Sequence, residues 1–492
     1  MVDEAAPSSA IGRLRLTGAA AWLLAGAVVA LSLVRLWLAG VQPLWFDESW
    51  TAMVAATPWR DLPHILRVDP NPPLYYLLMR GWAQVAGTSD LALRLPGLAA
   101  VALTAWLPTL MKAPGLGRSE RLAWGWLMFA WWGVDQFLLA RGFPVLLALS
   151  TAQIILFARL LEDPKTGRAL AWTWVSTACV MVHYYAAPLA LVQGLVFLAV
   201  HRKDALRTWP ATLALIPAIA WGAYHWSFLR QFASTQIAWH QTLDAQGVLG
   251  MVVFPLHHTA TLIALGVVVL IGAGMIWRGG GQGKVDRRLQ IAVAASWLAL
   301  ILVIASAAWR PTLIARYLTP AVPGVLLTLV LLSRRTAQPK AVLAGVSALY
   351  LIGLTPPLAM IRGPDDPSPY GHEKASQVLM QHGVTDVVFI WDHETIAAQD
   401  RAAVEAVGRF YFDRAGRPVR VTSPTWQRGD DLNHVALVAA SGAHPGVIWI
   451  YNRNTQTAAR THPPALEKLD PRFACESFGY EGLGSVACYR QP

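Results

Sequence analysis

Two adjacent acids, Asp47 and Glu48, stand in the aromatic stretch "QPLWFDESWTAMVAATPW", residues 41–58, directly after a long apolar run. Tryptophan and phenylalanine flank the pair on both sides, which indicates partial burial. A carboxylate in a dry, aromatic environment can act as a general base or can ligate a hard cation. The competing interpretation is a pair of solvated loop acids, which is the commoner role of acidic residues.

Further polar side chains follow the pair in the segment "HILRVDPNPPLYYLLMRGW", residues 64–82. We consider His64, Asp69, Asn71 and Tyr75 as candidates for a sugar or acceptor pocket. Because they lie between the same two apolar runs as the acidic pair, we expect them on the same side of the membrane.

Ionisable residues also stand at the ends of later apolar runs. Asp135 and Arg141 lie in the short turn "VDQFLLARGF", and His183 and Tyr184 end another run. A residue at such a position can be an interfacial anchor or a structural hydrogen-bonding group. The functional interpretation is a site on one membrane face, with Arg141 contacting a phosphate.

Arg310, Arg316 and Tyr317 flank the start of the run 317–333. The planar guanidinium matches phosphate oxygens and stays charged at any relevant pH. A salt bridge to a loop acid is the alternative. We favour phosphate binding, with Arg316 ahead of Arg310.

The elements that must position these residues are membrane helices. The chain has 492 residues, of which 55% are hydrophobic and 14% charged, whereas soluble domains carry about 25% charged residues. Apolar runs of about 20 residues are long enough to cross a bilayer. We expect about eleven spans, at 18–40, 91–111, 122–139, 143–161, 169–185, 186–200, 208–226, 254–277, 289–308, 317–333 and 340–358.

The formal net charge of +11 does not indicate a nucleic-acid partner, because the excess lysine and arginine lies in short loops between apolar runs. By the positive-inside rule these loops are cytoplasmic. The N-terminus is then inside, in the cytoplasmic (inner) membrane, and an odd number of spans places the C-terminus outside. The loop 41–90 lies on the outer face.

We predict two domains, a transmembrane domain over 1–358 and a small extracytoplasmic α/β domain over 359–492. In the latter, "VTDVVFIWDH", "RPVRVTSP" and "HPGVIWIYNRN" read as strands and "TIAAQDRAAVEAVGRFYF" as a helix. Cys475 and Cys488 can form a disulfide if this end faces an oxidising compartment.

The acidic pair, the segment "PNPPLYYLLMRGW" and the later "ARGFPVLLALS" resemble the C-type membrane glycosyltransferases, in particular the protein O-mannosyltransferase and aminoarabinose-transferase superfamily. "VHYYAAPLALVQ" and "ARYLTPAVPGVLLTLVLL" are similar to later segments of that superfamily. The resemblance covers about residues 15–335. It implies an enzyme that moves a sugar from a polyprenyl-phosphate donor to a lipid, glycan or protein acceptor on the outer face.

The resemblance assigns the catalytic carboxylate to Asp47, with Glu48 as its neighbour, and matches Asp135 to the acid of the second outer turn. It also implies that His183 lines the site. Many relatives have a histidine at the position of Asn71, so the acceptor side differs here.

The resulting hypothesis is that Asp47 activates an acceptor hydroxyl or amine while Arg316, with Arg141, holds the donor phosphate. A divalent metal is compatible with this chemistry, but a donor with one phosphate does not require it. The alternatives are a lipid or sugar transporter or flippase, which would carry ionisable groups at mid-span, and a membrane scaffold that displays the C-terminal domain.

Overall fold

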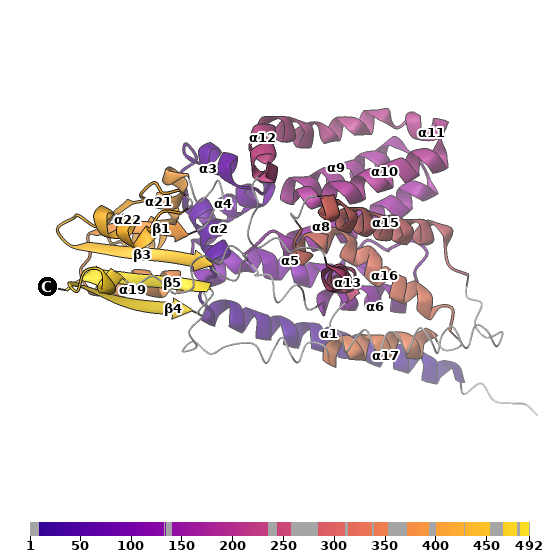
Figure 1. Ribbon diagram of the computed structural model, residues 1–492. Helices are drawn as coiled ribbons and strands as arrows, with labels where there is room; N and C mark the ends of the chain where they lie inside the picture. Colours follow the sequence, from indigo (N-terminus) through magenta and orange to yellow (C-terminus); the bar gives the residue numbers. More distant parts are fainter. Residues whose placement is uncertain are drawn as a thin grey trace, which may run out of the picture.

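The structure is a computed structural model of the whole chain (Figure 1). It describes residues 9–131, 133, 140–234, 244–256, 284–309, 313–336, 339–352, 371–392, 400–427, 429–452, 466–479 and 483–491. Helices form the larger part, and a small sheet unit lies at one end of them.

Most of the long helices run side by side, and α2, α3 and α4 lie between them and the sheet unit (Figure 1). The helical elements are α1 (Ser9–Val41), α2 (Phe46–Ala56), α3 (Leu62–Val68), α4 (Leu74–Ala86), α5 (Asp90–Leu110), α6 (Arg118–Phe129), α8 (Phe143–Glu162), α9 (Thr166–Val182), η1 (Tyr184–Ala186), α10 (Ala187–His201), α11 (Lys203–Leu206), η2 (Trp209–Leu215), α12 (Ile216–Ser234), α13 (Ala245–Val253), η3 (Phe254–Leu256), α15 (Arg287–Trp309), η4 (Ala315–Ala321), α16 (Val322–Ser333) and α17 (Pro339–Ile352).

The membrane-spanning character is present in the described helices, although the predicted number of about eleven spans is not established. Five helical segments are long and apolar enough to cross a bilayer, and a sixth arises if α1 and α2 count as one bent span. The predicted span 254–277 lies almost wholly outside the described residues, and α6 and α9 are too short to qualify. The five are Asp90–Leu110, Phe143–Glu162, Tyr184–His201, Arg287–Ala307 and Ala315–Ser333.

The segment 41–90, predicted as an outer loop, is mostly helical, and it begins with a sharp break. The axis turns by 79° between α1 and α2, and Pro43 lies in the break, where its ring disfavours helical geometry at the preceding residue. The side chain of Glu48 then accepts a hydrogen bond from the backbone N–H of Trp45, which satisfies the amide of the residue that precedes α2. The proline and this hydrogen bond together fix where the new helix begins.

The C-terminal residues fold into a mixed sheet with helices on both faces. Its strands are β1 (Asp386–Asp392), β2 (Arg420–Thr422), β3 (Pro445–Asn452), β4 (Phe473–Gly479) and β5 (Leu483–Arg490), in the order β2-β1-β3-β5-β4. β1 pairs in parallel with β2 and β3, whereas β5 pairs antiparallel with β3 and β4. The remaining elements are α19 (His372–Gln381), α21 (Arg401–Arg414), α22 (Leu432–Ala439) and η5 (Leu466–Lys468).

The three predicted strands and the predicted helix correspond to β1, β2, β3 and α21. Alternation along β1 divides the core, because Phe389 faces the side of α19 and α21 while Ile390 faces that of α22. The sequence analysis did not identify β4 and β5. The predicted domain boundary at 358 lies outside the described residues.

The sheet unit shares its hydrophobic core with the segment 41–90. One continuous cluster joins Trp50 of α2, Ile65 of α3 and Met79 of α4 to Val404 of α21 and Ile448 of β3. A second cluster fills the interior of the long helices. The C-terminal unit is therefore packed onto α2–α4 and does not hang from the membrane part as a separate tail.

Candidate functional site

The first turn of α2 directs three consecutive side chains to three different places. Successive residues of a helix are about 100° apart around its axis. Phe46 packs on Trp391 of β1, with ring centroids 4.9 Å apart, Asp47 meets arginines, and Glu48 is enclosed by the protein. The two adjacent acids therefore differ in environment and in the chemical role that each can have.

Asp47 lies between two guanidinium groups from distant parts of the chain. Its Oδ2 is 3.4 Å from Nη2 of Arg316 and 3.8 Å from Nη2 of Arg141. Arg141 also donates from Nη1 to the backbone carbonyl of Asp47 at 3.1 Å. The carboxylate side chain is 29% exposed, while the arginine side chains are 13% and 15% exposed. Two positive charges thus border an acid that solvent can still reach.

Aromatic rings hold Arg316 in this position. Its guanidinium carbon is 5.7 Å from the ring centroid of Trp45 and 5.8 Å from that of Phe143, both within cation–π range. Tyr317 stacks on Tyr185 at 4.9 Å. The predicted pair Arg316 and Tyr317 is therefore at the site, whereas Arg310 and Asp135 lie outside the described residues.

A small pocket opens beside Arg141. Asn71, Tyr75 and His183, all predicted as pocket residues, line it together with Tyr76. Its volume is about 20 Å³, which is room for one water-sized group such as a hydroxyl. The hydroxyl of Tyr75 is buried and has no hydrogen-bond partner among the described residues. Sequence positions more than a hundred residues apart thus meet around one small polar space.

Asp69 forms hydrogen bonds with two residues that line the small pocket, Asn71 and Tyr76. Its carboxylate accepts hydrogen bonds from the indole N–H of Trp50 at 2.5 Å, from the backbone and side-chain amides of Asn71 at 2.6 and 2.9 Å, and from the hydroxyl of Tyr76 at 2.9 Å. Burial raises the pKa of Asp69, against the opposing effect of these donors and of Arg141. With four donors on one buried carboxylate, Asp69 acts as a scaffold for the pocket.

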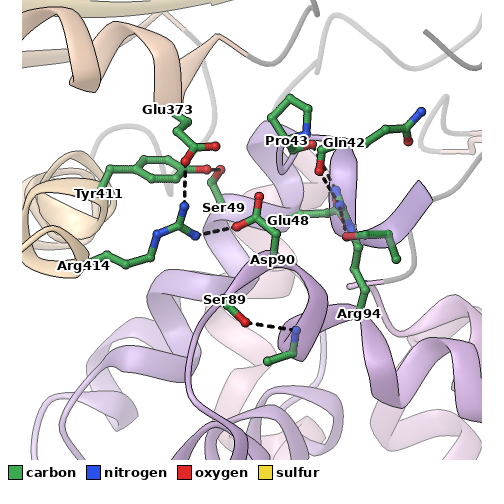
Figure 2. Close-up of polar contacts among 12 residues, drawn as sticks. Gln42, Pro43, Glu48, Ser49, Ser89, Asp90, Arg94, Glu373, Tyr411 and Arg414 are labelled. Atoms are coloured by element: carbon green, nitrogen blue, oxygen red, sulfur yellow. Dashed lines mark hydrogen bonds and ion pairs between the residues drawn. The ribbon is translucent and has the colours of Figure 1, made fainter. Parts of the chain in front are cut away.

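Glu48 was predicted as a catalytic acid, and its contacts favour a structural role instead. Arg94 donates to both of its oxygens, from Nε at 2.8 Å and from Nη2 at 2.6 Å (Figure 2). The backbone N–H groups of Trp45 and Ala140 supply two further hydrogen bonds. The side chain is 0% exposed. A carboxylate with four donors and no access to solvent is not available to a substrate.

Two other predicted pocket residues lie elsewhere. His64 is half exposed and its Nε2 is 3.1 Å from Oδ1 of Asp400, which begins α21, so it joins α3 to the C-terminal unit. Tyr184 forms hydrogen bonds with Nδ1 of His225 at 2.7 Å and with the indole N–H of Trp221 at 2.8 Å. Their side chains are occupied by contacts between protein elements.

An apolar groove lies on the other side of the Pro72–Pro73 turn from the small pocket. It has a volume of about 600 Å³ and is lined almost entirely by carbon atoms of α3, α4, α9 and α12. Pro73 and Met181 line the groove, whereas their chain neighbours Pro72 and Val182 line the small pocket. A polar space and a long apolar groove are therefore separated by two short stretches of chain.

Among the described residues around Asp47, no group of three potential metal ligands lies close together. Within the described residues, the one group of three potential ligands close enough to share an ion is Glu467, Cys475 and Cys488. The two cysteines of that group are disulfide-bonded to each other across β4 and β5. Asp47 faces two cationic groups, which repel a metal ion rather than attract it.

Sequence reasoning missed Arg94, Tyr76 and Tyr411. Arg94 carried a usable signal, since a charged residue near the start of an apolar span needs a specific partner. The phenol of Tyr411 forms a hydrogen bond with the hydroxyl of Ser49 at 2.9 Å. No local sequence pattern predicts that contact, because the two residues are 362 positions apart in the chain.

Comparison with known proteins identifies the fold. No family model matches the chain, and no curated protein matches its sequence. The solved structures that match include ArnT from Cupriavidus metallidurans in the apo state and the same protein bound to undecaprenyl phosphate. Each has a TM-score of 0.57 at 12% identity; the apo match covers 96% of this chain and 98% of that one, the complex 95% and 98%. The chain therefore has the fold of ArnT, and the resemblance given in the sequence analysis is confirmed at the level of the fold.

Proposed function

We propose that this chain is a membrane glycosyltransferase that moves a sugar from a polyprenyl-phosphate donor to a hydroxyl or amine acceptor on the outer membrane face. The observation that carries the proposal is the position of Asp47, a partly exposed carboxylate between Arg316 and Arg141 at one end of an apolar helical bundle. The likeness to a fold solved with undecaprenyl phosphate supports the choice of donor.

The charges of the site suit the donor phosphate. The contacts of 3.4 and 3.8 Å between Asp47 and the two arginines are long for charge-assisted hydrogen bonds, which typically measure about 2.7–2.9 Å. A phosphate with more charge and more oxygens competes for both guanidinium groups. Binding of the donor would thus satisfy Arg316 and Arg141 and leave the carboxylate of Asp47 facing the acceptor.

The reaction then needs one proton transfer and one displacement. Asp47 takes the proton of the acceptor O–H or N–H as the acceptor atom bonds to the anomeric carbon. The bond between that carbon and the phosphate oxygen breaks, and its electron pair leaves with the polyprenyl phosphate. Arg316 and Arg141 stabilise the charge that develops on the departing phosphate.

The apolar groove and the small pocket beside the site can hold other parts of the donor and the acceptor. We assign the isoprenoid chain of the donor to the apolar groove beside Pro73 and Met181, because its carbon lining suits a hydrocarbon. We assign the small pocket to a hydroxyl of the sugar or acceptor, with the unpartnered hydroxyl of Tyr75 and the amide of Asn71 as its hydrogen-bonding groups.

We further propose that this end of the bundle faces outward from the cytoplasmic membrane. The C-terminal unit packs on α2–α4 at the end where α1 stops, which fits a cytoplasmic N-terminus (Figure 1). The bond between Cys475 and Cys488 fits an oxidising compartment. The predicted division into a membrane domain and an extracytoplasmic domain is part of this proposal.

The test is transfer from a panel of polyprenyl-phosphate sugars into membranes that contain the wild-type chain, Asp47→Asn or Arg316→Gln. We expect Asp47→Asn to lower kcat by about 10²–10⁴-fold, the usual contribution of a general base. Arg316→Gln should raise the donor KM. Arg409→Gln, an exposed arginine of α21 paired with Asp413, is the matched control. Full activity of Asp47→Asn would refute the assignment of the base.

A further inference from the structure

The C-terminal unit holds one face of the helix that carries Asp47. Residues 46, 49 and 50 lie on the same side of α2, because positions three and four apart share a helix face. On that side, Phe46 and Trp50 pack on Trp391 at 4.9 and 5.7 Å between ring centroids. Every one of these three α2 side chains contacts the C-terminal unit, since Ser49 meets Tyr411.

Hydrogen bonds and ion pairs also join the C-terminal unit to α2 and α5, and they restrain the orientation of these elements as well as the distance between them. The hydroxyls of Ser49 and Tyr411 are 2.9 Å apart, and both residues are buried. Figure 2 shows Arg414 between two carboxylates, Asp90 at the start of α5 and Glu373 of α19, at 2.5 and 2.7 Å. The guanidinium bridges the membrane part and the C-terminal unit with one rigid fork.

The opposite restraint on α2 comes from the membrane part. Arg94 of α5 holds Glu48, one residue after Asp47, by two hydrogen bonds. Arg94 and Asp90 are one helical turn apart on α5. The same helix therefore contacts α2 through Arg94 and the C-terminal unit through Asp90 (Figure 2). The rotation of α2 is therefore set from both sides.

We propose that the C-terminal unit positions the catalytic carboxylate, and that Tyr411 is a positioning residue that acts through Ser49 on the orientation of Asp47. The inference rests on the proposed function, in which Asp47 is the general base. It assigns the C-terminal unit a part in the transfer step itself, since a helix rotation that moves a carboxylate by about 1 Å can cost about 10²-fold in rate.

The experiment compares Tyr411→Phe with the double variant Ser49→Ala/Tyr411→Phe. The single change leaves the hydroxyl of Ser49 buried without its partner and should lower thermal stability. Removing both hydroxyls leaves two apolar surfaces of nearly the same shape, so stability should recover. If Tyr411 positions α2, kcat stays about 10- to 100-fold below wild type in the double variant although stability returns, while the donor KM stays within about two-fold.

Hydrogen exchange provides a readout that needs no donor. We expect the amides of 46–56 to exchange about five-fold faster in the double variant, because α2 opens locally more easily without its contact to Tyr411, and this local opening is a separate event from the global unfolding whose free energy recovers. Arg409→Gln, on α21 but outside the junction, is the control and should leave both readouts at wild-type values. Recovery of kcat together with stability, or wild-type exchange of α2, overturns the inference. If the wild-type chain transfers no sugar at all, the proposed function fails, and the exchange of 46–56 still decides whether the C-terminal unit restrains the helix.

Discussion

Replacing Glu48 with glutamine separates the two adjacent acids by experiment. The substitution keeps the shape of the side chain and removes its charge. Arg94 would remain buried with a positive charge and without its direct ion-pair partner, since its other hydrogen bonds go to the carbonyls of Ala39, Gln42 and Pro43, and Asp90 acts on it without a direct contact. Breaking a buried ion pair in this way costs about 3–5 kcal/mol. We therefore expect a large loss of thermal stability for Glu48→Gln.

Asp47→Asn should behave in the opposite way. Its carboxylate is partly exposed and its contacts with Arg141 and Arg316 are 3.8 and 3.4 Å long, so the loss of its charge should cost less stability than breaking the enclosed pair of Glu48 and Arg94. Its stability should stay near wild type while transfer falls. The assay is thermal unfolding in detergent by intrinsic fluorescence, with transfer measured per folded molecule at a temperature where both variants are folded.

A double-mutant cycle checks the physical reason. Arg94→Met strips the carboxylate of Glu48 of its cation, whereas Glu48→Gln/Arg94→Met removes both charges. Residues in one buried network couple by about 0.5–3 kcal/mol, so the double variant should lose less stability than the sum of the singles. Recovery will be partial, because three backbone carbonyls lose their donor. Wild-type stability of Glu48→Gln combined with abolished transfer would show that Glu48, not Asp47, is the chemical group.

Two further predictions concern the C-terminal unit. Burial lowers the pKa of His372 to about 3, so the unfolded chain takes up a proton below about pH 6.5 that the folded chain refuses. Its stability should fall by about 1.4 kcal/mol per pH unit between those values, and His372→Phe should remove this slope from unfolding curves measured from pH 7 to 4; identical slopes would contradict the burial argument. The disulfide between Cys475 and Cys488 closes a 13-residue separation, so Cys475→Ser/Cys488→Ser should destabilise the unit by about 3 kcal/mol. Maleimide labelling of the denatured, unreduced chain should modify Cys179 alone; labelling of all three cysteines would show that the bond is absent.

The membrane-spanning character of the long helices and the α/β character of the C-terminal residues could be predicted, because both follow from local composition, whereas the predicted number of about eleven spans is not established. A run of about twenty apolar residues is long enough to cross a bilayer, and the cluster of β-branched and apolar residues in "VTDVVFIWDH" predicts β1 from local composition in the same way. β4 was not recognised, since "FACESFG" alternates weakly and most of its residues are polar or small. The break before α2 was also missed, because it depends on Pro43 and on the hydrogen bond that Glu48 accepts from Trp45.

The sequence by itself determined that Asp47 stands at the edge of a membrane span among aromatics, and that arginines such as Arg316 stand at the edges of others. Only the tertiary structure decided which of the two acids solvent can reach. Asp47 and Glu48 are adjacent in the chain, and successive side chains of a helix are rotated by about 100° around its axis. Asp47 therefore contacts Arg316, whereas Glu48 contacts Arg94. Partners 46 and 269 residues away set those environments, and contacts at such separations leave no trace in a local pattern.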